Sequence, residues 1–359
     1  MRGQRALALG LLALVIVTAT VIQALLRQDE AVPARSTSAA GAPPVAASPS
    51  AAAQLASSAS LAPSSPAARP TLAPTPPPTA TPLPSATPTP PPPTPTPTIA
   101  PPARTGQGQP PVVNAAYIAV VDEDSGQVLY EKGSHQRSAP ASITKIVTAI
   151  VALERADPKA RVKVSFDPSE LVDSTVMGLR VGDEVTLEDL LYGLMLPSGN
   201  DAALAIADYV GGSKARFVEM MNDKVRELGL KDTQFKNPHG LDQEGHYTSA
   251  YDIVMLARYG MQHYPLFVKL AGARAWTVQS SRGAYEIYNL NRFLFNYPGA
   301  DGVKIGYTDA AGRTIVASAT RNGHRVYVGL LHVGDIVADT TPLMNWAFSN
   351  YTWSSGAGG

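Results

Sequence analysis

The side chains that build a hydrophobic core are confined to the last two-thirds of this sequence. No Phe, Trp or Tyr occurs before Tyr117, whereas 24 of the 32 prolines lie between Pro33 and Pro111. A segment without large apolar side chains cannot bury enough surface to offset the conformational entropy that folding removes. We therefore predict one folded domain over residues 113–351, long enough for a sizeable core, and a disordered tail over residues 352–359.

The first residues form a long apolar run. After Arg2 and Arg5, the segment Ala6–Leu26 contains only three polar side chains, and a helix of this length spans about 30 Å, close to the hydrocarbon thickness of a bilayer. The two arginines predict a cytoplasmic N-terminus. We expect residues 1–27 to be an uncleaved signal anchor that leaves the rest of the chain outside; cleavage would instead give a secreted protein.

Residues 28–112 are predicted to be a disordered linker. The stretch "APTPPPTATPLPSATPTPPPPTPTPT" consists of proline and small or hydroxyl residues with a single leucine, and proline favours the extended polyproline II conformation. At about 3.1 Å per residue such a segment can reach roughly 260 Å. A spacer of this kind would let an anchored domain act well away from the membrane.

The remaining sequence predicts an α+β fold. Two β-rich runs in "AAYIAVVDEDSGQVLYEKG" flank a turn sequence and predict a hairpin. Helices are predicted over residues 142–155, 186–209 with a break at "PSGN", 213–228, and from Ser249 to the residue before Pro265. Strand patterns follow in "AWTVQS", "AYEIYNL", "DGVKIGYT", "RTIVASAT" and "HRVYVGLLHV", before a closing amphipathic helix, "PLMNWAFSNY". This order predicts an antiparallel sheet flanked by helices, with an additional all-helical region.

Composition argues against several kinds of function. The formal net charge is zero, which gives no indication of a nucleic-acid partner, and the absence of cysteine removes thiol chemistry and disulfides. None of the six histidines has the spacing H-E-x-x-H or H-x-x-E, so we expect neither a metal nor another cofactor.

Ser142 and Lys145 form the first candidate catalytic pair. In "PASITKIVTAI" they are three residues apart and share one face of the predicted helix. Lys145 lies in an otherwise apolar run, where desolvation would favour the neutral amine, and the helix N-terminus favours a developing oxyanion. Taken alone, the pair is explained better by a helix cap and a lysine that reaches the surface, because an isolated S-x-x-K often occurs by chance.

Two further motifs place polar residues at unusual positions. "MLPSGNDAALAIA" puts Ser198 and Asn200 at a break in a core helix, where polar groups are costly to bury without partners, although an ordinary capped turn would look the same. "GVKIGYT" puts Lys304 in a strand pattern beside Gly306, where another backbone can approach closely. A lysine on an edge strand is the simpler alternative.

Together the three motifs follow the order S-x-x-K, S-x-N and K-x-G of penicillin-binding proteins and class A β-lactamases. Over about Ala115–Val333 the chain resembles the serine-type D-alanyl-D-alanine carboxypeptidases, the low-molecular-mass penicillin-binding proteins. The resemblance is carried by "PASITK", "GLMLPSGNDAALAIAD", "FVEMMNDKVRELGL", "NPHGLD", "HYTSAYDIVMLAR" and "YPGADGVKIGYTDAAG". It implies the β-lactamase and penicillin-binding-protein fold, and a hydrolase on the outer face of the bacterial cytoplasmic membrane. That enzyme would remove the terminal D-alanine from peptidoglycan stem peptides, with β-lactams as covalent inhibitors.

The resemblance also implies roles for the five residues of the motifs. Ser142 would be the nucleophile that is acylated, and Lys145 the base that takes its proton. Ser198 would relay a proton to the leaving amine, and Asn200 would hydrogen-bond the substrate peptide. Lys304 would keep Lys145 neutral through like-charge repulsion.

Further groups are implied to bind the substrate. The backbone N–H groups of Ser142 and Tyr307 would form the oxyanion hole. Gly306 and Thr308 would contact the substrate, and Arg325, in "TRNGHRVYV", would hold the terminal carboxylate of D-alanine, for which a guanidinium fork is well suited.

Ile305 departs from this pattern, because the family usually has threonine there. Isoleucine has no hydrogen-bond donor, and one lost bond to a charged group costs about 1.5–3 kcal/mol. We expect an active but slower enzyme. Alternatives left open are a D,D-endopeptidase with the same site and a catalytically impaired wall-binding protein. A class A β-lactamase would need a deacylating glutamate, and "EMMN" at 219–222 is better explained as part of an amphipathic helix.

Overall fold

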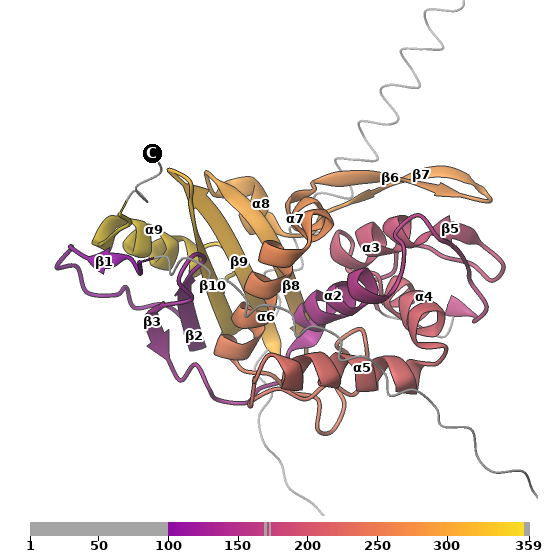
Figure 1. Cartoon of the computed structure of the whole chain (residues 1–359), viewed down its shortest axis with the longest axis horizontal. Coiled ribbons are helices and arrows are strands. Elements are labelled where there is room, and N and C mark those ends of the chain that lie inside the picture. Colours follow the sequence, from indigo (N-terminus) through magenta and orange to yellow (C-terminus); the bar gives the residue numbers. More distant parts are fainter. Residues whose placement is uncertain (1–99, 169–170, 172–173, 355–359) are drawn as a thin grey trace, which may run out of the picture. The chain divides into compact units, whose positions relative to one another are not determined.

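The computed structural model describes residues 100–354 except 169–170 and 172–173, so the predicted anchor, the linker up to residue 99 and the last five residues lie outside the described residues (Figure 1). Within the described part of the chain, no helix is long and apolar enough to cross a membrane. A five-stranded antiparallel sheet lies at the centre, with strand order β3-β2-β10-β9-β8. The strands are β2 (Ala115–Asp122), β3 (Val128–Lys132), β8 (Ala300–Thr308), β9 (Gly312–Arg321) and β10 (His324–Val333). β8 is therefore an edge strand.

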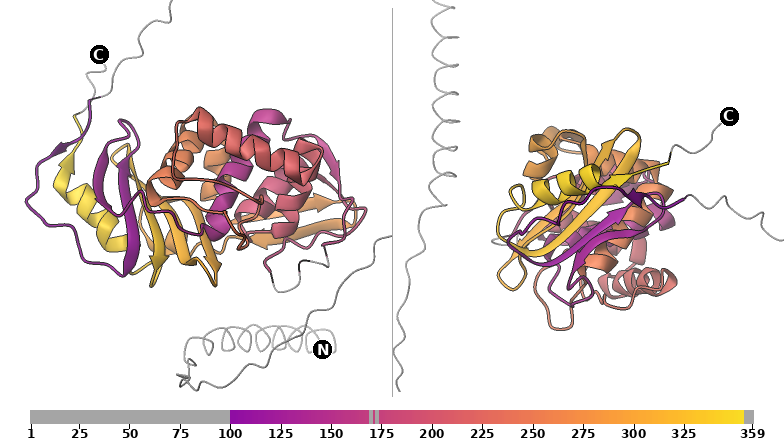
Figure 2. Two further views of the ribbon diagram at one scale, coloured as in Figure 1. Left: turned by 90° about the horizontal axis from the view of Figure 1, so that it is seen from below. Right: turned by 90° about the vertical axis from the view of Figure 1, so that its left-hand side faces the viewer.

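Both faces of the sheet are buried. β2 directs Ile118 and Val120 into one apolar cluster and Ala119 and Val121 into another, as the two-residue period of a strand requires. The first cluster is covered by α9 (Thr340–Asn350), and the second by α6 (Ala250–His263) and the helical region (Figures 1 and 2). The predicted α+β architecture is thus confirmed.

The helical region surrounds one central helix. This helix, α2 (Lys145–Arg155), has eight buried residues in succession from its first residue. It packs against α3 (Leu187–Met195), α4 (Asn200–Gly211), α5 (Lys214–Glu227) and α6. The predicted break at "PSGN" is confirmed, because α3 ends and α4 begins on either side of it.

Several short elements were not predicted. They are the antiparallel pair β4 (Arg161–Lys163) and β5 (Glu184–Thr186), α7 (Pro265–Gly272) and α8 (Arg292–Asn296). The helix predicted from Ser142 begins as η1, a 3-10 helix (Ala141–Thr144). Pro265, read as a helix stop, also begins a helix, since proline fits the first helical position. The predicted strands "AWTVQS" and "AYEIYNL" form a separate hairpin, β6 (Ala275–Ser280) and β7 (Gly283–Tyr288), outside the central sheet.

The folded region extends beyond both predicted boundaries. β1 (Ala103–Arg104), inside the predicted linker, pairs with β11 (Tyr351–Thr352), and Trp353 donates from Nε1 to Asp122 Oδ1 at 2.6 Å. The prediction failed at the start because residues 103–108 contribute backbone rather than large side chains. The N–H groups of residues 105 and 106 bond the Asn350 carbonyl, at 2.9 and 3.1 Å.

Candidate active site

The start of α2 brings Ser142 and Lys145 together. Ser142 lies in η1, and Lys145, the first residue of α2, is completely buried with its Nζ 3.0 Å from Ser142 Oγ. Lys145 Nζ also donates to Asn200 Oδ1 and to the backbone oxygen of His239, both at 2.6 Å. Burial lowers the pKa of Lys145 well below its usual value, and the neighbouring Lys304 lowers it further.

Ser198 lies in the turn between α3 and α4 in a strained conformation. Its backbone φ of 64° is in the left-handed region, and its buried Oγ is one of the polar atoms without a hydrogen-bond partner among the described residues. Left-handed backbone at a non-glycine residue and an unpaired buried hydroxyl each cost on the order of 1–3 kcal/mol. Such costs are typical of positions that serve a substrate rather than the fold.

Asp201, for which the sequence predicted no role in the site, holds one wall of the site. Its carboxylate accepts from the backbone N–H groups of residues 177–179, at 2.9–3.0 Å. In the same loop, Thr175 donates its hydroxyl to Ser198 O and accepts at its carbonyl from Asn200 N, both at 2.8 Å. The position of Asp201 next to Asn200 at a predicted helix start was the only sequence signal for it.

The edge strand β8 forms the opposite wall. Lys304 is 2% exposed, and burial lowers its pKa to about 7. A Cβ at Gly306 would lie 2.6 Å from Ser142 N and 2.7 Å from Thr314 Oγ1. The predicted close approach of another backbone at Gly306 is therefore confirmed, and that backbone is the one that carries Ser142.

A second glycine supports the same segment from the other side. Gly240 has a φ of 98°, and a Cβ there would lie 1.9 Å from the backbone oxygen of Ala141. The adjacent His239 supplies the carbonyl that binds Lys145. "NPHGLD" thus contacts Ala141 and Lys145, on either side of Ser142, through backbone atoms, and a pattern of side chains does not show such contacts.

These walls enclose a cavity of about 420 Å³. Polar, apolar and basic side chains line it. The lining residues are Ser142, Ser174, Thr175, Ser198, Asn200, Leu241, Leu290, Arg292, Ile305, Gly306, Tyr307, Thr308, Arg313 and Ile336. Six of the nine predicted site residues are in the lining, and a seventh, Lys145, is hydrogen-bonded to two lining residues. Lys304 lies on β8 next to Ile305, which is in the lining.

Two further predicted residues of β8 line the cavity: Tyr307, predicted for the oxyanion hole, and Thr308, predicted to bind the substrate. Tyr307 is 63% exposed. Thr308 donates its hydroxyl to Asp242 Oδ1 at 2.7 Å, so that hydroxyl is already engaged as a donor.

The prediction for Arg325 is wrong. Its Nε lies 2.9 Å from Asp301 Oδ2 and its Nη1 3.6 Å from Glu123 Oε1, outside the cavity lining. It pairs with Thr320 at one end of β9, whereas Gly306 and Tyr307 pair with the other end. A strand pattern shows which residues alternate, but it does not show which end of the strand reaches the site.

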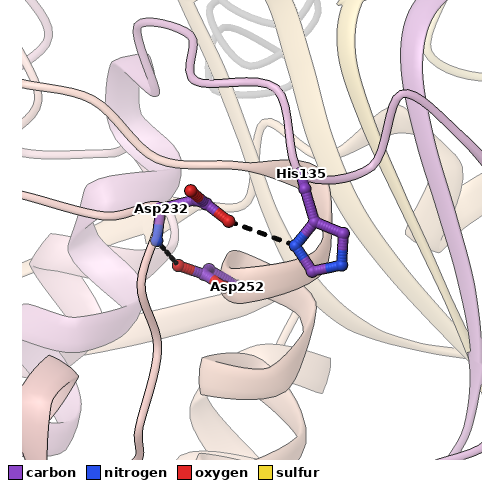
Figure 3. Close-up of side chains that lie close together, drawn as sticks. All are labelled: His135, Asp232 and Asp252. Carbon is purple, nitrogen blue, oxygen red and sulfur yellow. Dashed lines mark hydrogen bonds and ion pairs between the residues drawn. The ribbon is translucent and has the colours of Figure 1, made fainter.

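One group of side chains has the composition of a metal site. His135, Asp232 and Asp252 offer ligand atoms within 4.8 Å of one another (Figure 3). The group is already hydrogen-bonded: His135 Nδ1 lies 3.1 Å from Asp232 Oδ2, and Asp252 Oδ2 accepts from Asp232 N at 2.7 Å. The Arg137 guanidinium, 3.4 Å from Asp232, supplies the positive charge that a metal would bring.

Comparisons with known proteins agree with this geometry. Residues 104–333 match the family model described as D-alanyl-D-alanine carboxypeptidase, peptidase family S11. The chain is 38% identical over 246 residues to D-alanyl-D-alanine carboxypeptidase DacF of Bacillus subtilis, covering 66% of this chain and 63% of that protein. It is 34% identical over 259 residues to DacD of Escherichia coli, covering 68% and 66%. The chain thus spans just under two-thirds of the length of these relatives.

Solved structures give the same result. The Streptomyces K15 DD-transpeptidase superposes with a TM-score of 0.64 at 32% identity, over 67% of this chain and all of that one. A penicillin-binding protein homologue from Mycobacterium tuberculosis has a TM-score of 0.64 at 32% identity, over 68% and 95%. The fold implied by the resemblance is confirmed, and the chain belongs to the D-alanyl-D-alanine carboxypeptidase family, peptidase family S11.

Proposed function

We propose that this chain is a serine D,D-carboxypeptidase that removes the terminal D-alanine of peptidoglycan stem peptides through an acyl-enzyme on Ser142. The observation that carries the proposal is the 3.0 Å contact between Ser142 Oγ and a completely buried lysine amine, beside a substrate-sized cavity. Family membership supplies the substrate class.

Proton transfer from Ser142 follows from the hydrogen bonds of Lys145. A neutral amine has two N–H bonds and one lone pair. The two shortest contacts of Lys145 Nζ, both 2.6 Å, are to carbonyl oxygens of Asn200 and His239, which only accept. The lone pair is then left for Ser142, whose hydroxyl can donate, and Lys145 accepts that proton as Ser142 Oγ attacks the scissile carbonyl.

The remaining steps return the proton and release the products. The N–H groups of Ser142 and Tyr307 would stabilise the oxyanion, and a donor of this kind is typically worth about 2.7–4 kcal/mol. As the C–N bond breaks, the proton on Lys145 passes through the Ser198 hydroxyl to the nitrogen of the departing D-alanine. Water then attacks the ester on Ser142, which releases the shortened peptide and restores the hydroxyl. No metal or cofactor takes part in this scheme.

We propose further that β-lactams acylate Ser142, and that residues 1–27 anchor the chain at the outer face of the cytoplasmic membrane. The support for the anchor is the apolar run Ala6–Leu26. The Pro-rich segment after it would let the domain reach stem peptides at a distance from the membrane. Secretion after cleavage remains the alternative.

The test is the intact mass of the chain after incubation with benzylpenicillin, together with D-alanine release from a peptide that ends in D-Ala-D-Ala. We expect an adduct and D-alanine release, both absent in Ser142→Ala. An adduct that persists in Ser142→Ala would refute the nucleophile. Release of no D-alanine by the parent would contradict the carboxypeptidase and favour the impaired wall-binding protein, for which Ile305 is the one supporting observation. Cleavage of crosslinked stems alone would identify an endopeptidase.

A further inference from the structure

If the substrate ends in a carboxylate, the cavity needs a group that binds this negative charge. The hydroxyl expected at position 305 is absent, and Arg325 is bonded to carboxylates elsewhere. We infer that Arg313 binds the terminal carboxylate of the substrate and thereby selects peptides with a free C-terminus. This inference rests on the proposed function.

The charged groups around the cavity favour Arg313 over Arg292 as the residue that binds the carboxylate. The described lining contains two guanidinium groups, Arg292 and Arg313, and no acidic side chain. Arg292 Nη2 lies 3.1 Å from Asp335 Oδ2 and is therefore already paired. Arg313 makes one hydrogen bond, from Nη1 to the backbone oxygen of Gly334 at 3.2 Å, and has no carboxylate within ion-pair distance in the described part of the chain.

Arg313 therefore keeps most of its binding capacity. A guanidinium has five N–H donors, and the bond to a carbonyl uses one of them. The remaining donors can bind both oxygens of a carboxylate in the bidentate arrangement that arginine favours. The side chain belongs to an exposed residue, so it can reorient toward a ligand without breaking an ion pair.

The register of β8 and β9 places Arg313 at the end of the apolar wall. Ile305 pairs with Ile315, and two residues further along Tyr307 pairs with Arg313. Residues two apart on a strand share a face, so Arg313 lies on the same face as Ile305, two cross-strand pairs further along the ladder. A D-alanine residue bound there would meet apolar side chains with its methyl group and the guanidinium with its carboxylate.

The nearby carboxylates are already engaged by other groups. Asp335 accepts from the N–H groups of residues 337 and 338 and from Arg292. Asp242 accepts from Thr308 Oγ1 and from Ala310 N at the β8–β9 turn. Arg313 lies close enough to Asp335 to contribute to the lowering of its pKa, but it forms no ion pair with it. Of the two arginines in the described lining, Arg313 is therefore the one without a bonded carboxylate.

The test compares two substrates in the full chain: a tripeptide ending in D-Ala-D-Ala with a free carboxylate, and the same peptide with a C-terminal amide. Arg313→Gln is expected to lower kcat/KM for the acid by about 10- to 100-fold, the effect of one hydrogen bond to a charged group, and to leave kcat/KM for the amide unchanged. Arg313→Lys should retain part of the preference for the acid, because it keeps the charge and loses the fork.

Arg325→Gln is the matched control, since the sequence pattern favoured that arginine. It should keep the acid-to-amide ratio of the parent even if part of the protein unfolds, because the ratio does not depend on the amount of folded enzyme. An unchanged kcat/KM for the acid in Arg313→Gln, or an equal loss on acid and amide, would overturn the inference while the parent still releases D-alanine. A parent that releases none overturns the proposed function, and this inference with it.

Discussion

Lys304→Met is expected to stabilise the folded chain at neutral pH while it slows acylation. Lys304 is 2% exposed, and its Nζ makes one hydrogen bond, 3.1 Å to the backbone oxygen of Ile305. No carboxylate of the described residues lies within ion-pair distance of it. A buried lysine without an anionic partner costs folding free energy, because the fold must either desolvate its charge or remove its proton.

The lowered pKa gives the magnitude. Burial lowers the pKa of Lys304 from 10.5 to about 7, which at 1.36 kcal/mol per pH unit corresponds to about 5 kcal/mol. Between about pH 7 and pH 10 the unfolded state binds one more proton at this residue than the folded state. Raising the pH through this window therefore stabilises the parent by up to about 1.4 kcal/mol per pH unit, and Lys304→Met lacks this contribution.

Urea unfolding at pH 7, 8 and 9 measures the gain in the free energy of unfolding and the slope of that free energy against pH. Lys224→Met is the matched control, because Lys224 is equally buried, at 5% exposed, but its Nζ lies 2.7 Å from Glu154 and 2.8 Å from Glu227. Its loss leaves Glu154 without its cation and should destabilise the chain by about 3–5 kcal/mol. The reasoning is refuted if Lys304→Met is less stable than the parent at pH 7, or if the two have parallel pH slopes.

Three further variants test the site. Lys145→Met should fold at least as well as the parent, by the same burial argument, and form no benzylpenicillin adduct by intact mass; a normal adduct would exclude Lys145 as the base. Gly306→Ala should lose acylation by 100-fold or so in stopped-flow assays, because its Cβ would meet Ser142 N at 2.6 Å, and parental kinetics would contradict the tight approach. Ile305→Thr should raise kcat/KM on the D-Ala-D-Ala acid by about tenfold; no gain would mean that Arg313 alone suffices.

The residues of the site that could be predicted are those whose chemistry is local in sequence. Ser142 and Lys145 are three residues apart, so any helical conformation brings them to one face. Ser198 and Asn200 were found because polar residues interrupt an apolar helix. Gly306 was found because glycine within a strand indicates that another backbone approaches closely there. Each of these motifs was ambiguous when taken alone, and their assignment to one site came from the resemblance to the carboxypeptidase family.

The residues that escaped prediction depend on long-range geometry or on backbone atoms. Arg313 and Arg325 lie on adjacent strands with similar patterns, and only the strand ends distinguish them. The carbonyl of His239 binds Lys145 through an atom that every residue has. The boundary at residue 113 was wrong because β1 joins the fold through backbone pairing with β11, which aromatic content does not report.

The position of α2 explains why a lysine occurs in an apolar helix. The helix packs among α3–α6, where Lys145 is completely buried, and this burial lowers the pKa of its amine. A surface helix would let the side chain extend into solvent and keep its proton, which would leave Ser142 without a base. Burying the Lys145 amine costs folding free energy. The two apolar clusters on either side of the sheet offset this cost, because large areas of apolar side chain are buried in both. In the proposed mechanism the core of the domain is therefore part of the catalytic apparatus, because burial of the Lys145 amine favours the neutral form that can act as a base.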